Sequence, residues 1–324
     1  MSTSILKHKP SINSSRLGVP ILFLFFNRLS VTKKVFNTIK EAKPMKIYLA
    51  SDGPREGDDN ELEIVESVRD YVLSNIDWDC EIHTLFQNKN LGCKYACSRA
   101  VKWFFENEEM GIVLEDDTMP DKSFFKYCEN LLNHYKNDKR IGMIGGHAPI
   151  NNHNASESYY FSKYVRFWGW ASWRRAWDHY DVELSNFDKL MEAKVLSSST
   201  LSSREERYWS KVAKKLSRGE LDTWDFQWLL VCLSQSMLTI VPSVNLVSNL
   251  GFGPDATHTL NIDSAHNNGD SFEMTFPLSH PNFILYNKFF DEKLIESEFL
   301  PSFQRRVIFR FSKKLSIRKN KFFS

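Results

Sequence analysis

The chain has 324 residues, of which 42% are hydrophobic and 25% charged, as in an ordinary globular protein with a substantial core. The formal net charge of +2 argues against a dedicated nucleic-acid-binding protein. The charge is uneven, because residues 301–324 carry eight Lys or Arg and no acid. Subtracting these eight from the total leaves −6 on the first 300 residues.

The amino end is polar and Ser-rich, and residues 1–17 are expected to be disordered. No secretory signal is visible, and the apolar run 19–26 is too short to span a bilayer. The five cysteines are scattered without a second Cys/His pair for zinc, which favours free thiols in a reducing compartment. A cytoplasmic catalytic body is therefore expected.

The first half alternates apolar runs with amphipathic stretches. Strands are predicted at 19–26, 45–50, 80–86, 111–114 and 141–144, and helices at 30–41, 61–73, 91–107 and 123–135. Apolar strands separated by helices imply parallel pairing with helices on both faces, so an α/β doubly wound sheet.

The second half is less regular. Strands are predicted at 159–165 and 238–247, helices at 203–217 and 225–236, with a Trp-rich stretch at 167–173 and a Gly-rich loop at 249–254. The expected division is a disordered end (1–17), one domain (18–300) and a basic tail (301–324). The domain would have a nucleotide-binding half, 18–150, and an acceptor half, 151–300.

Polar clusters follow four of the predicted strands, at Asn27-Arg28, Asp52-Gly53, Gln87-Asn88 and Glu115-Asp116-Asp117. Ligands of such sheets bind beyond the carboxyl ends of the strands. Neighbouring carboxylates repel unless a cation lies between them, and Mn²⁺ or Mg²⁺ binds one or two carboxylates plus substrate phosphates. We expect Asp117 to bind the metal, with Glu115 or Asp116 on ribose or sugar hydroxyls; the alternative is a solvated acidic turn.

Each companion residue also has a second interpretation. Asp52 would accept the N–H of a uracil-like base, but Ser-Asp-Gly-Pro is also an ordinary turn. Arg28 would pair with a diphosphate or base, or be a surface charge. Asn90 and Lys94 would face the nucleotide, or cap the following helix and be solvated.

The order Phe-Asn27-Arg28, Ala-Ser-Asp52, Asn90-Leu-Gly and Val-Leu-Glu115-Asp-Asp, with Pro-Asp and Phe-Phe behind it, resembles the GT-A glycosyltransferases. The likeness is greatest to the inverting N-acetylglucosaminyltransferase I type, and Trp168-Gly-Trp170-Ala is similar to bacterial family-2-like sugar transferases. It spans roughly residues 19 to 258. The resemblance implies a GT-A (Rossmann-like) mixed sheet flanked by helices.

The resemblance also implies roles. Arg28 and Asp52 match nucleotide-binding positions, Asp117 the metal ligand, and Glu115 and Asp116 the contacts to nucleotide and donor sugar. A catalytic Asp in a Trp-Asp segment corresponds to Asp225, although the eukaryotic enzymes have two Asp after that Trp and a membrane anchor that is lacking here.

An inverting transfer needs a base for the acceptor hydroxyl. Asp225 lies between Trp224 and Phe226, where partial desolvation would raise its pKa. Asp222 is a second candidate, and either residue would serve instead as a helix cap.

Aromatic residues and a loop complete the expected site. Trp168 and Trp170 would stack on a sugar, or pack in the core. The loop 251–257, ending at His258, would close over a diphosphate and exclude water, or be an exposed loop without a role; His147 is a weaker candidate.

The basic tail shows an apolar helical face (Phe303, Val307, Ile308, Phe311 and Leu315). A basic amphipathic helix suits an anionic membrane surface, or is a solvated or packed terminal helix.

Together these features predict a metal-dependent glycosyltransferase. It would move a sugar from a nucleotide diphosphate donor, UDP-sugar being favoured, to a glycan or lipid-linked acceptor, with inversion, in surface polysaccharide or glycolipid synthesis. A sugar-nucleotide pyrophosphorylase is the alternative, although the first strand lacks a Gly- and Lys/Arg-rich phosphate loop. A non-enzymatic carbohydrate-binding protein is the third.

Overall fold

The computed structural model describes residues 5–7, 16–251 and 270–300. Its strands are β1 (Ile5–Lys7), β2 (Ile21–Phe25), β3 (Lys46–Ser51), β4 (Glu81–Phe86), β5 (Met110–Glu115), β6 (Thr118–Pro120), β7 (Ile141–Gly145), β8 (Tyr159–Ser162), β9 (Trp170–Trp173), β10 (Leu238–Pro242) and β11 (Val247–Asn249). Its helices are α1 (Leu29–Ala42), α2 (Asp59–Ser74), α3 (Gly92–Asn107), α4 (Lys122–His134), α5 (Arg174–Trp177), α6 (Phe187–Glu192), α7 (Val195–Ser199), α8 (Ser203–Ser217), α9 (Asp225–Ser234), α10 (Lys288–Leu294) and the π-helical turn η2 (Ile295–Phe299).

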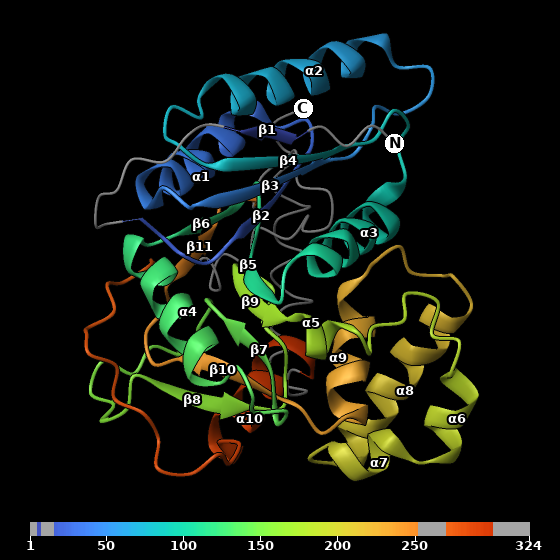
Figure 1. The fold of residues 1–324 in the computed structure, drawn as a ribbon. Helices are drawn as coiled ribbons and strands as arrows, with labels where there is room; N and C mark the ends of the chain where they lie inside the picture. The colour runs from blue at the N-terminus through green and yellow to red at the C-terminus, as the bar shows by residue number, and fades with distance from the viewer. Residues whose placement is uncertain (1–4, 8–15, 252–269, 301–324) are drawn as a thin grey trace, which may run out of the picture.

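Within these described ranges, nine strands form one mixed sheet in the order β1-β4-β3-β2-β5-β9-β7-β10-β8 (Figure 1). Strands β4, β3, β2 and β5 are parallel neighbours, and β10 is parallel to β7. Strand β9 is antiparallel to both β5 and β7, and β8 is an antiparallel edge. The mixed α/β sheet flanked by helices is confirmed, but β9 separates two strands that a purely doubly wound sheet would leave adjacent.

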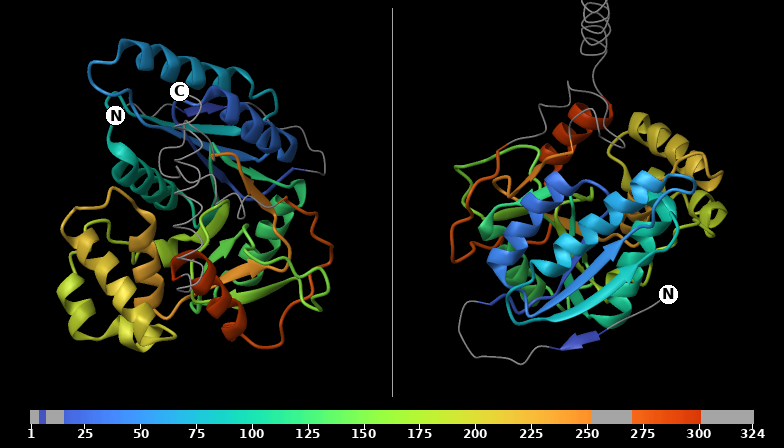
Figure 2. Two further views of the ribbon diagram at one scale, coloured as in Figure 1. Left: turned by 180° about the vertical axis from the view of Figure 1, so that it is seen from behind. Right: turned by 90° about the horizontal axis from the view of Figure 1, so that it is seen from above.

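The two faces of the sheet pack against different helices, because successive residues of a strand point to opposite sides. Phe23 and Leu49 face the core formed with α1, α2 and α4. Leu22 and Tyr48 face the core formed with α3, α8 and α9. Figures 1 and 2 show α1 and α2 on one side of the parallel strands and α3 on the other.

The predicted strand 238–247 is two strands. Pro242 ends β10, since it has no N–H to continue a ladder, and β11 leaves to pair with β6 instead. In that small antiparallel sheet Val247 lies opposite Pro120 and Asn249 opposite Thr118. The chain after β11 is thereby brought to the acidic triplet at the end of β5.

Helix α10 is hydrogen-bonded to the end of strand β8 in the sheet. The buried carboxylate of Asp291 in α10 accepts hydrogen bonds from the Ser162 hydroxyl (2.5 Å) and the Lys163 N–H (3.1 Å) at the end of β8. Burial raises the pKa of Asp291 to about 6, although both hydrogen bonds oppose the shift.

Several predictions from the sequence concern the two ends of the chain. Residues 5–7, within the stretch expected to be disordered, pair antiparallel with β4. The basic tail lies outside the described residues, and the domain division stays a prediction. None of the helices in the described ranges is long and apolar enough to cross a membrane.

Two Leu residues on helices provide a matched test of the core. Leu131 in α4 is fully buried, whereas Leu62 in α2 is 45% exposed. We expect Leu131→Ala to lower the free energy of unfolding by about 2–5 kcal/mol, because it removes packed atoms and leaves a cavity. Leu62→Ala should change it by less than about 0.5 kcal/mol. Urea unfolding followed by circular dichroism measures both, and similar losses would contradict the packing described.

Candidate active site

The parallel strands bring the predicted site residues to one edge of the sheet. Phe25 of β2 lies opposite Ser51 of β3, and Leu24 lies opposite Glu115 of β5. The residues that follow these strand ends therefore emerge side by side. This places Arg28, Asp52 and the acidic triplet together, as the parallel pairing implied.

Arg28 links the last two carboxylates of the triplet, those of Asp116 and Asp117. Its guanidinium donates to Asp117 Oδ2 at 3.0 Å and to Asp116 Oδ1. Asp116 is only 4% exposed, and burial raises its pKa to about 6 although Arg28 opposes the shift. The other oxygen of this side chain, Oδ2, is buried without a hydrogen-bond partner.

Glu115 connects the triplet to the second half of the chain. Burial raises its pKa well above the usual range, and the nearby carboxylates of Asp117, Asp116 and Asp225 raise it further. Asp225 is the first residue of α9, more than a hundred residues along the chain. The fold thus brings the predicted base into electrostatic range of the predicted donor-binding carboxylates.

The loop after β11 packs directly on Asp117. Leu250 donates its N–H to the Asp117 carbonyl at 2.7 Å, and the Gly251 N–H donates to Asn249 Oδ1 at 2.6 Å. A Cβ on Gly251 would lie 2.3 Å from Asp117 Oδ2, so a larger residue here would displace the Asp117 carboxylate. The predicted closing loop starts here, and His258 lies outside the described residues.

The Asp52 side chain binds backbone N–H groups. Its carboxylate accepts the N–H groups of Gly53 (2.8 Å), Leu91 (2.9 Å) and Gly92 (3.1 Å), and so fixes the turn that starts α3. Burial raises its pKa, and these hydrogen bonds oppose the shift. This arrangement agrees with the second interpretation of Asp52, an ordinary turn. A contact of Asp52 with a nucleotide base stays a prediction.

Lys94 is also committed within the protein. It is 8% exposed, and its ammonium pairs with Glu183 Oε2 at 2.9 Å. Its backbone N–H donates to Asp222 Oδ1 at 3.1 Å. Asp222 thus binds the first turn of α3, which is the capping alternative. A contact of Lys94 with a nucleotide stays a prediction.

Asp225 lies at the start of α9 and also at a cavity, and its role as base stays a prediction. Its Oδ1 accepts the Phe226 N–H at 2.8 Å and the Thr223 hydroxyl, which caps α9. The residue also lines a cavity of about 210 Å³ together with Trp168 and Arg166. A carboxylate held in place at a cavity wall is suited to take a proton from a bound hydroxyl.

The two central tryptophans lie in different places. Trp170 is fully buried in β9 and stacks on Trp224, with ring centroids 5.8 Å apart. The prediction that Trp170 faces a sugar is wrong for this structure, because its ring fills the core between the sheet and α9. Trp168 instead reaches the cavity, 4.3 Å from the His147 ring between centroids. Gly169, at φ +56°, makes the bend between them.

The carboxylates fit a divalent cation by their chemistry. The buried, unpartnered Asp116 Oδ2 beside Asp117 is a hard oxygen donor of the kind that Mg²⁺ and Mn²⁺ bind. No three His, Cys, Asp or Glu side chains in the described ranges form a complete metal group. Asp116 and Asp117 would therefore supply two ligands, and a diphosphate the remainder.

Sequence reasoning missed several residues that shape the site. The Thr118 hydroxyl accepts the Glu115 N–H and donates to the Glu115 carbonyl, at 3.0 Å each. A Thr three residues after Glu115 is a sequence pattern that indicates a turn. Glu183, which holds Lys94, and the pair Arg166–Glu298 come from distant parts of the chain. No local pattern marks contacts at such separations.

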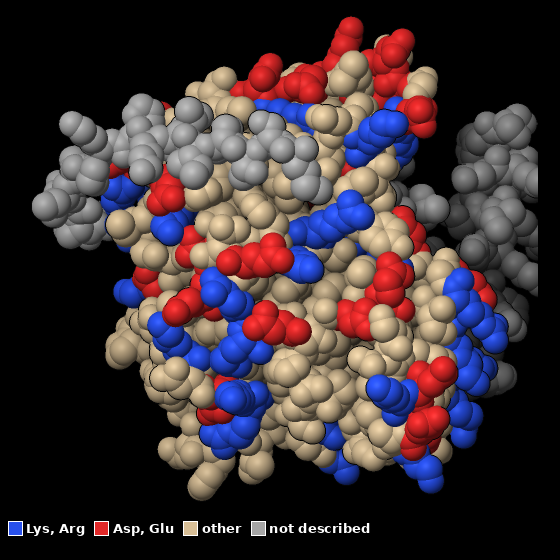
Figure 3. Space-filling model, turned by 45° about the vertical axis from the view of Figure 1, so that its right-hand side comes forward, with Lys and Arg blue, Asp and Glu red and all other residues tan. Residues whose placement is uncertain are grey.

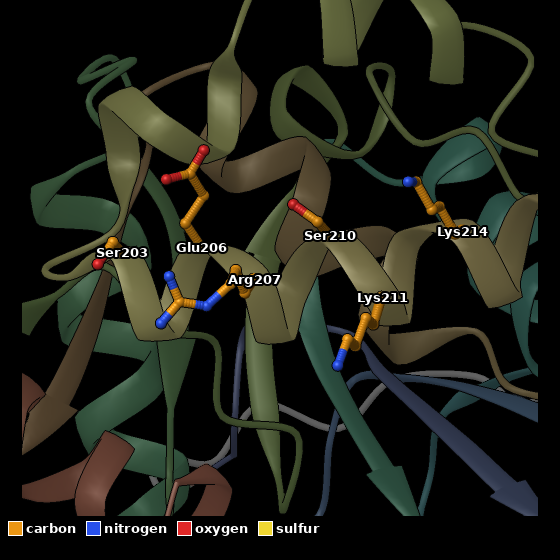
Figure 4. A pocket seen from close by; sticks show the side chains of 6 residues that line it. All are labelled: Ser203, Glu206, Arg207, Ser210, Lys211 and Lys214. Carbon is orange, nitrogen blue, oxygen red and sulfur yellow. The ribbon is translucent and has the colours of Figure 1, made fainter.

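Other surfaces of the described protein have a different character. Figure 4 shows a hollow of about 300 Å³ along α8, lined by residues of this one helix whose charged side chains project outward. None of the strand-end residues takes part in it. On the face shown in Figure 3, basic and acidic side chains are interspersed.

No family model matches the chain, and no curated protein matches it. Similar solved structures include the mannosyltransferase PcManGT from Pyrobaculum calidifontis in complex with GDP-Man and Mn²⁺, at 10% identity and TM-score 0.38 over 68% of this chain and 69% of that one. HddC from Yersinia pseudotuberculosis matches at 12% identity and TM-score 0.31, over 48% and 77%. The glycosyltransferase GlyE of Streptococcus pneumoniae TIGR4 matches at 10% identity and TM-score 0.33, over 69% and 45%. These partial likenesses assign no activity to this chain.

Arg28 can be tested as the partner of the carboxylates. Arg28→Met should lower the free energy of unfolding by about 1–3 kcal/mol, because it leaves buried carboxylates without their cation. Mn²⁺ should then raise the melting temperature of the variant more than that of the wild type. Arg140→Met, which removes an exposed pair with Asp138, is the control and should change stability by at most about 1 kcal/mol. Equal responses of the two variants to Mn²⁺ would contradict the assignment.

Proposed function

We propose that the protein is a metal-dependent glycosyltransferase. It transfers a sugar from a nucleotide diphosphate donor, favoured as UDP-sugar, to a hydroxyl of a glycan or lipid-linked acceptor, with inversion. Surface polysaccharide or glycolipid synthesis is the process that suits such acceptors. The resemblance of the segment that ends in Glu115-Asp116-Asp117 to GT-A enzymes agrees with this proposal.

One observation carries it. The carboxylate of Asp116, at the end of β5, pairs with the guanidinium of Arg28, which follows β2. Asp225, at the start of α9, lies beside a cavity and within electrostatic range of Glu115. A diphosphate leaving group needs a cation site, and an acceptor hydroxyl needs a base. Groups suited to both requirements lie near one another in the fold, which supports the proposal.

In this proposal the first half binds the donor. Asp117 and Asp116 hold Mn²⁺ or Mg²⁺, which when bound would neutralise the charge developing on the departing diphosphate. Arg28, released in part from the carboxylates, pairs with a phosphate oxygen. Glu115 forms a hydrogen bond with a sugar hydroxyl.

The second half activates the acceptor. Asp225 Oδ2 takes the proton of the acceptor hydroxyl while its oxygen attacks the anomeric carbon, and Thr223 and the Phe226 N–H hold the carboxylate in position. A single displacement of this kind inverts the anomeric centre.

The competing functions differ in what they bind. A pyrophosphorylase needs a Gly- and Lys/Arg-rich phosphate loop, whereas the segment after β2 in this chain is Phe-Asn27-Arg28-Leu-Ser. A carbohydrate-binding protein needs neither nucleotide nor metal. Stabilisation by a nucleoside diphosphate only when Mn²⁺ is present fits transfer, whereas indifference to both favours the binding protein.

Asp117 is the first residue to test. Asp117→Asn should abolish the Mn²⁺-dependent rise in melting temperature with UDP and slow hydrolysis of the donor by on the order of a hundredfold or more. Asp77→Asn, at an exposed residue paired with Lys40, should behave as the wild type. The assignment fails if Asp117→Asn keeps its full response to Mn²⁺ with every nucleotide in a UDP, GDP and CMP panel.

Asp225 is tested separately from donor binding. Asp225→Asn should lower kcat by about 10²–10⁴, because the amide cannot take the proton, while the thermal shift with UDP and Mn²⁺ persists. Loss of the nucleotide shift with unchanged kcat would place Asp225 on the donor instead.

A further inference from the structure

The exposed face of helix α8 is basic. Its opposite face is apolar and packs inward, with Trp209 1% and Leu216 5% exposed. Each residue turns an α-helix by about 100°, so side chains three, four and seven positions apart share a face. By this spacing, five exposed cations lie within about a third of the helix circumference, opposite the buried face: Arg207, Lys211, Lys214, Lys215 and, at the C-cap, Arg218.

The acids of the described protein leave this face largely unpaired. Of its five cations, only Arg218 has an ion-pair partner within the described ranges, Glu220 at 3.7 Å. Figure 4 shows Arg207 and Lys211 projecting from one side of α8 and Glu206 from the other. The basic face is therefore open to an anionic partner.

The charge of the remaining chain makes this face distinctive. Residues 1–4, 8–15, 252–269 and 301–324, which the structure does not describe, contain nine Lys or Arg and two acids, Asp255 and Asp263. Subtracting these from the total of +2 leaves −5 on the described residues. The two acids could neutralise at most two of the five cations. The face thus stays cationic on a described protein that is acidic as a whole.

Large apolar side chains are exposed next to this helix. Phe283, Leu285 and Phe289 are 74%, 71% and 60% exposed, and no other large apolar side chain in the described ranges exceeds 52%. Phe289 belongs to α10, which continues directly into η2. Phe299 of η2 packs on Trp209 of α8 with ring centroids 5.0 Å apart, and both views of Figure 2 show α10 and η2 beside α8.

Cations and exposed apolar side chains in neighbouring elements favour a lipid bilayer as the partner. An anionic bilayer attracts Lys and Arg, and it takes apolar side chains into the boundary between headgroups and acyl chains. A nucleic-acid duplex offers mainly the charge. The described chain also ends at Leu300, directly after η2, and the 24 residues that follow in the sequence carry eight cations and no acid.

We propose that the basic face of α8, together with Phe283, Leu285 and Phe289, docks the protein on an anionic lipid bilayer. The cations pair with lipid phosphates, and the apolar side chains enter the headgroup boundary. This surface belongs to the described part of the chain and is separate from the predicted role of residues 301–324. It also stands whichever reaction the site at the edge of the sheet performs.

The test uses the full-length chain and vesicles of phosphatidylcholine with or without phosphatidylglycerol, in co-sedimentation assays. The α8 variant replaces three cations of the face by Gln: Arg207→Gln, Lys211→Gln and Lys214→Gln. It should bind the phosphatidylglycerol vesicles at least about tenfold more weakly than the wild type, because each cation near an anionic surface adds to the attraction. The loss should shrink as salt is added, since salt screens exposed charges.

A control variant removes the same charge elsewhere. It replaces three exposed cations of α1, α3 and the turn before β7: Lys34→Gln, Lys102→Gln and Lys139→Gln. Its binding to the phosphatidylglycerol vesicles should stay within about twofold of the wild type. Equal losses in the α8 variant and the control would mean that net charge alone drives binding, and would overturn the docking face.

The apolar part of the surface is tested in the same assay. Phe283→Ser with Leu285→Ser should weaken binding to phosphatidylglycerol vesicles by about tenfold, because two side chains lose their apolar burial in the bilayer. Leu62→Ser with Ile64→Ser, at residues of α2 that are 45% and 44% exposed, is the matched control. If both pairs bind like the wild type, the apolar side chains do not enter the bilayer and the proposal fails.

Amide hydrogen exchange of the wild type decides the matter without variants. On phosphatidylglycerol vesicles, exchange should slow in α8 and in residues 283–289 and stay unchanged in α2. Slowing confined to residues 301–324 would overturn the proposal. So would an α8 variant that binds vesicles like the wild type but has lost binding to a duplex RNA, because the basic face would then serve a nucleic acid.

Discussion

The contact on which the rest of the site depends is that of Arg28 with Asp116 and Asp117. Three consecutive acidic residues at the end of a buried strand would repel one another, and Asp116 is almost wholly removed from water. The guanidinium from the end of β2 offsets part of that cost, but the second oxygen of Asp116 stays buried without a partner. The edge of the sheet is thus held in an incompletely neutralised state. Buried carboxylates that are only partly neutralised are typical of sites where a protein is less stable in order to bind a ligand.

Most of the remaining polar groups at this edge serve the architecture. Asp52 fixes the start of α3 through three backbone N–H groups, Asp222 caps the same helix, and Lys94 is paired with Glu183. These contacts hold this edge of the sheet in place, because each loop that follows a strand is hydrogen-bonded to the next element. Fewer groups are therefore left for the proposed chemistry than the sequence indicated: the triplet, Arg28 and Asp225. A rigid frame around a small reactive set agrees with catalysis by placed charges.

Much of the first half was predictable. Apart from β1 and β6, which were not expected, its strands and helices up to β7 lie within about two residues of those expected. The reason is that fully buried parallel strands are continuous apolar runs and their helices are amphipathic. The strand-end rule then grouped Arg28, Asp52 and the triplet correctly. The Trp-rich stretch was misjudged because aromatic residues suit a ligand wall and a central strand equally. Only the pairing of β9 with both β5 and β7 shows that Trp170 belongs to the core. Pro242 marked a break in a strand, but not that β11 would pair with β6.

By itself the sequence determined the layered α/β architecture and the acidic edge, because both arise from local patterns: hydrophobic periodicity, and polar residues directly after strands. The tertiary structure alone decided which of these residues have partners. It paired Arg28 with the triplet across 88 residues, brought Asp225 beside Glu115, and joined Arg166 to Glu298 across 132 residues. Electrostatic and hydrogen-bond partners are chosen by distance in space, and a side chain that is free to bind a ligand cannot be told from one already bound by the protein until the chain is folded.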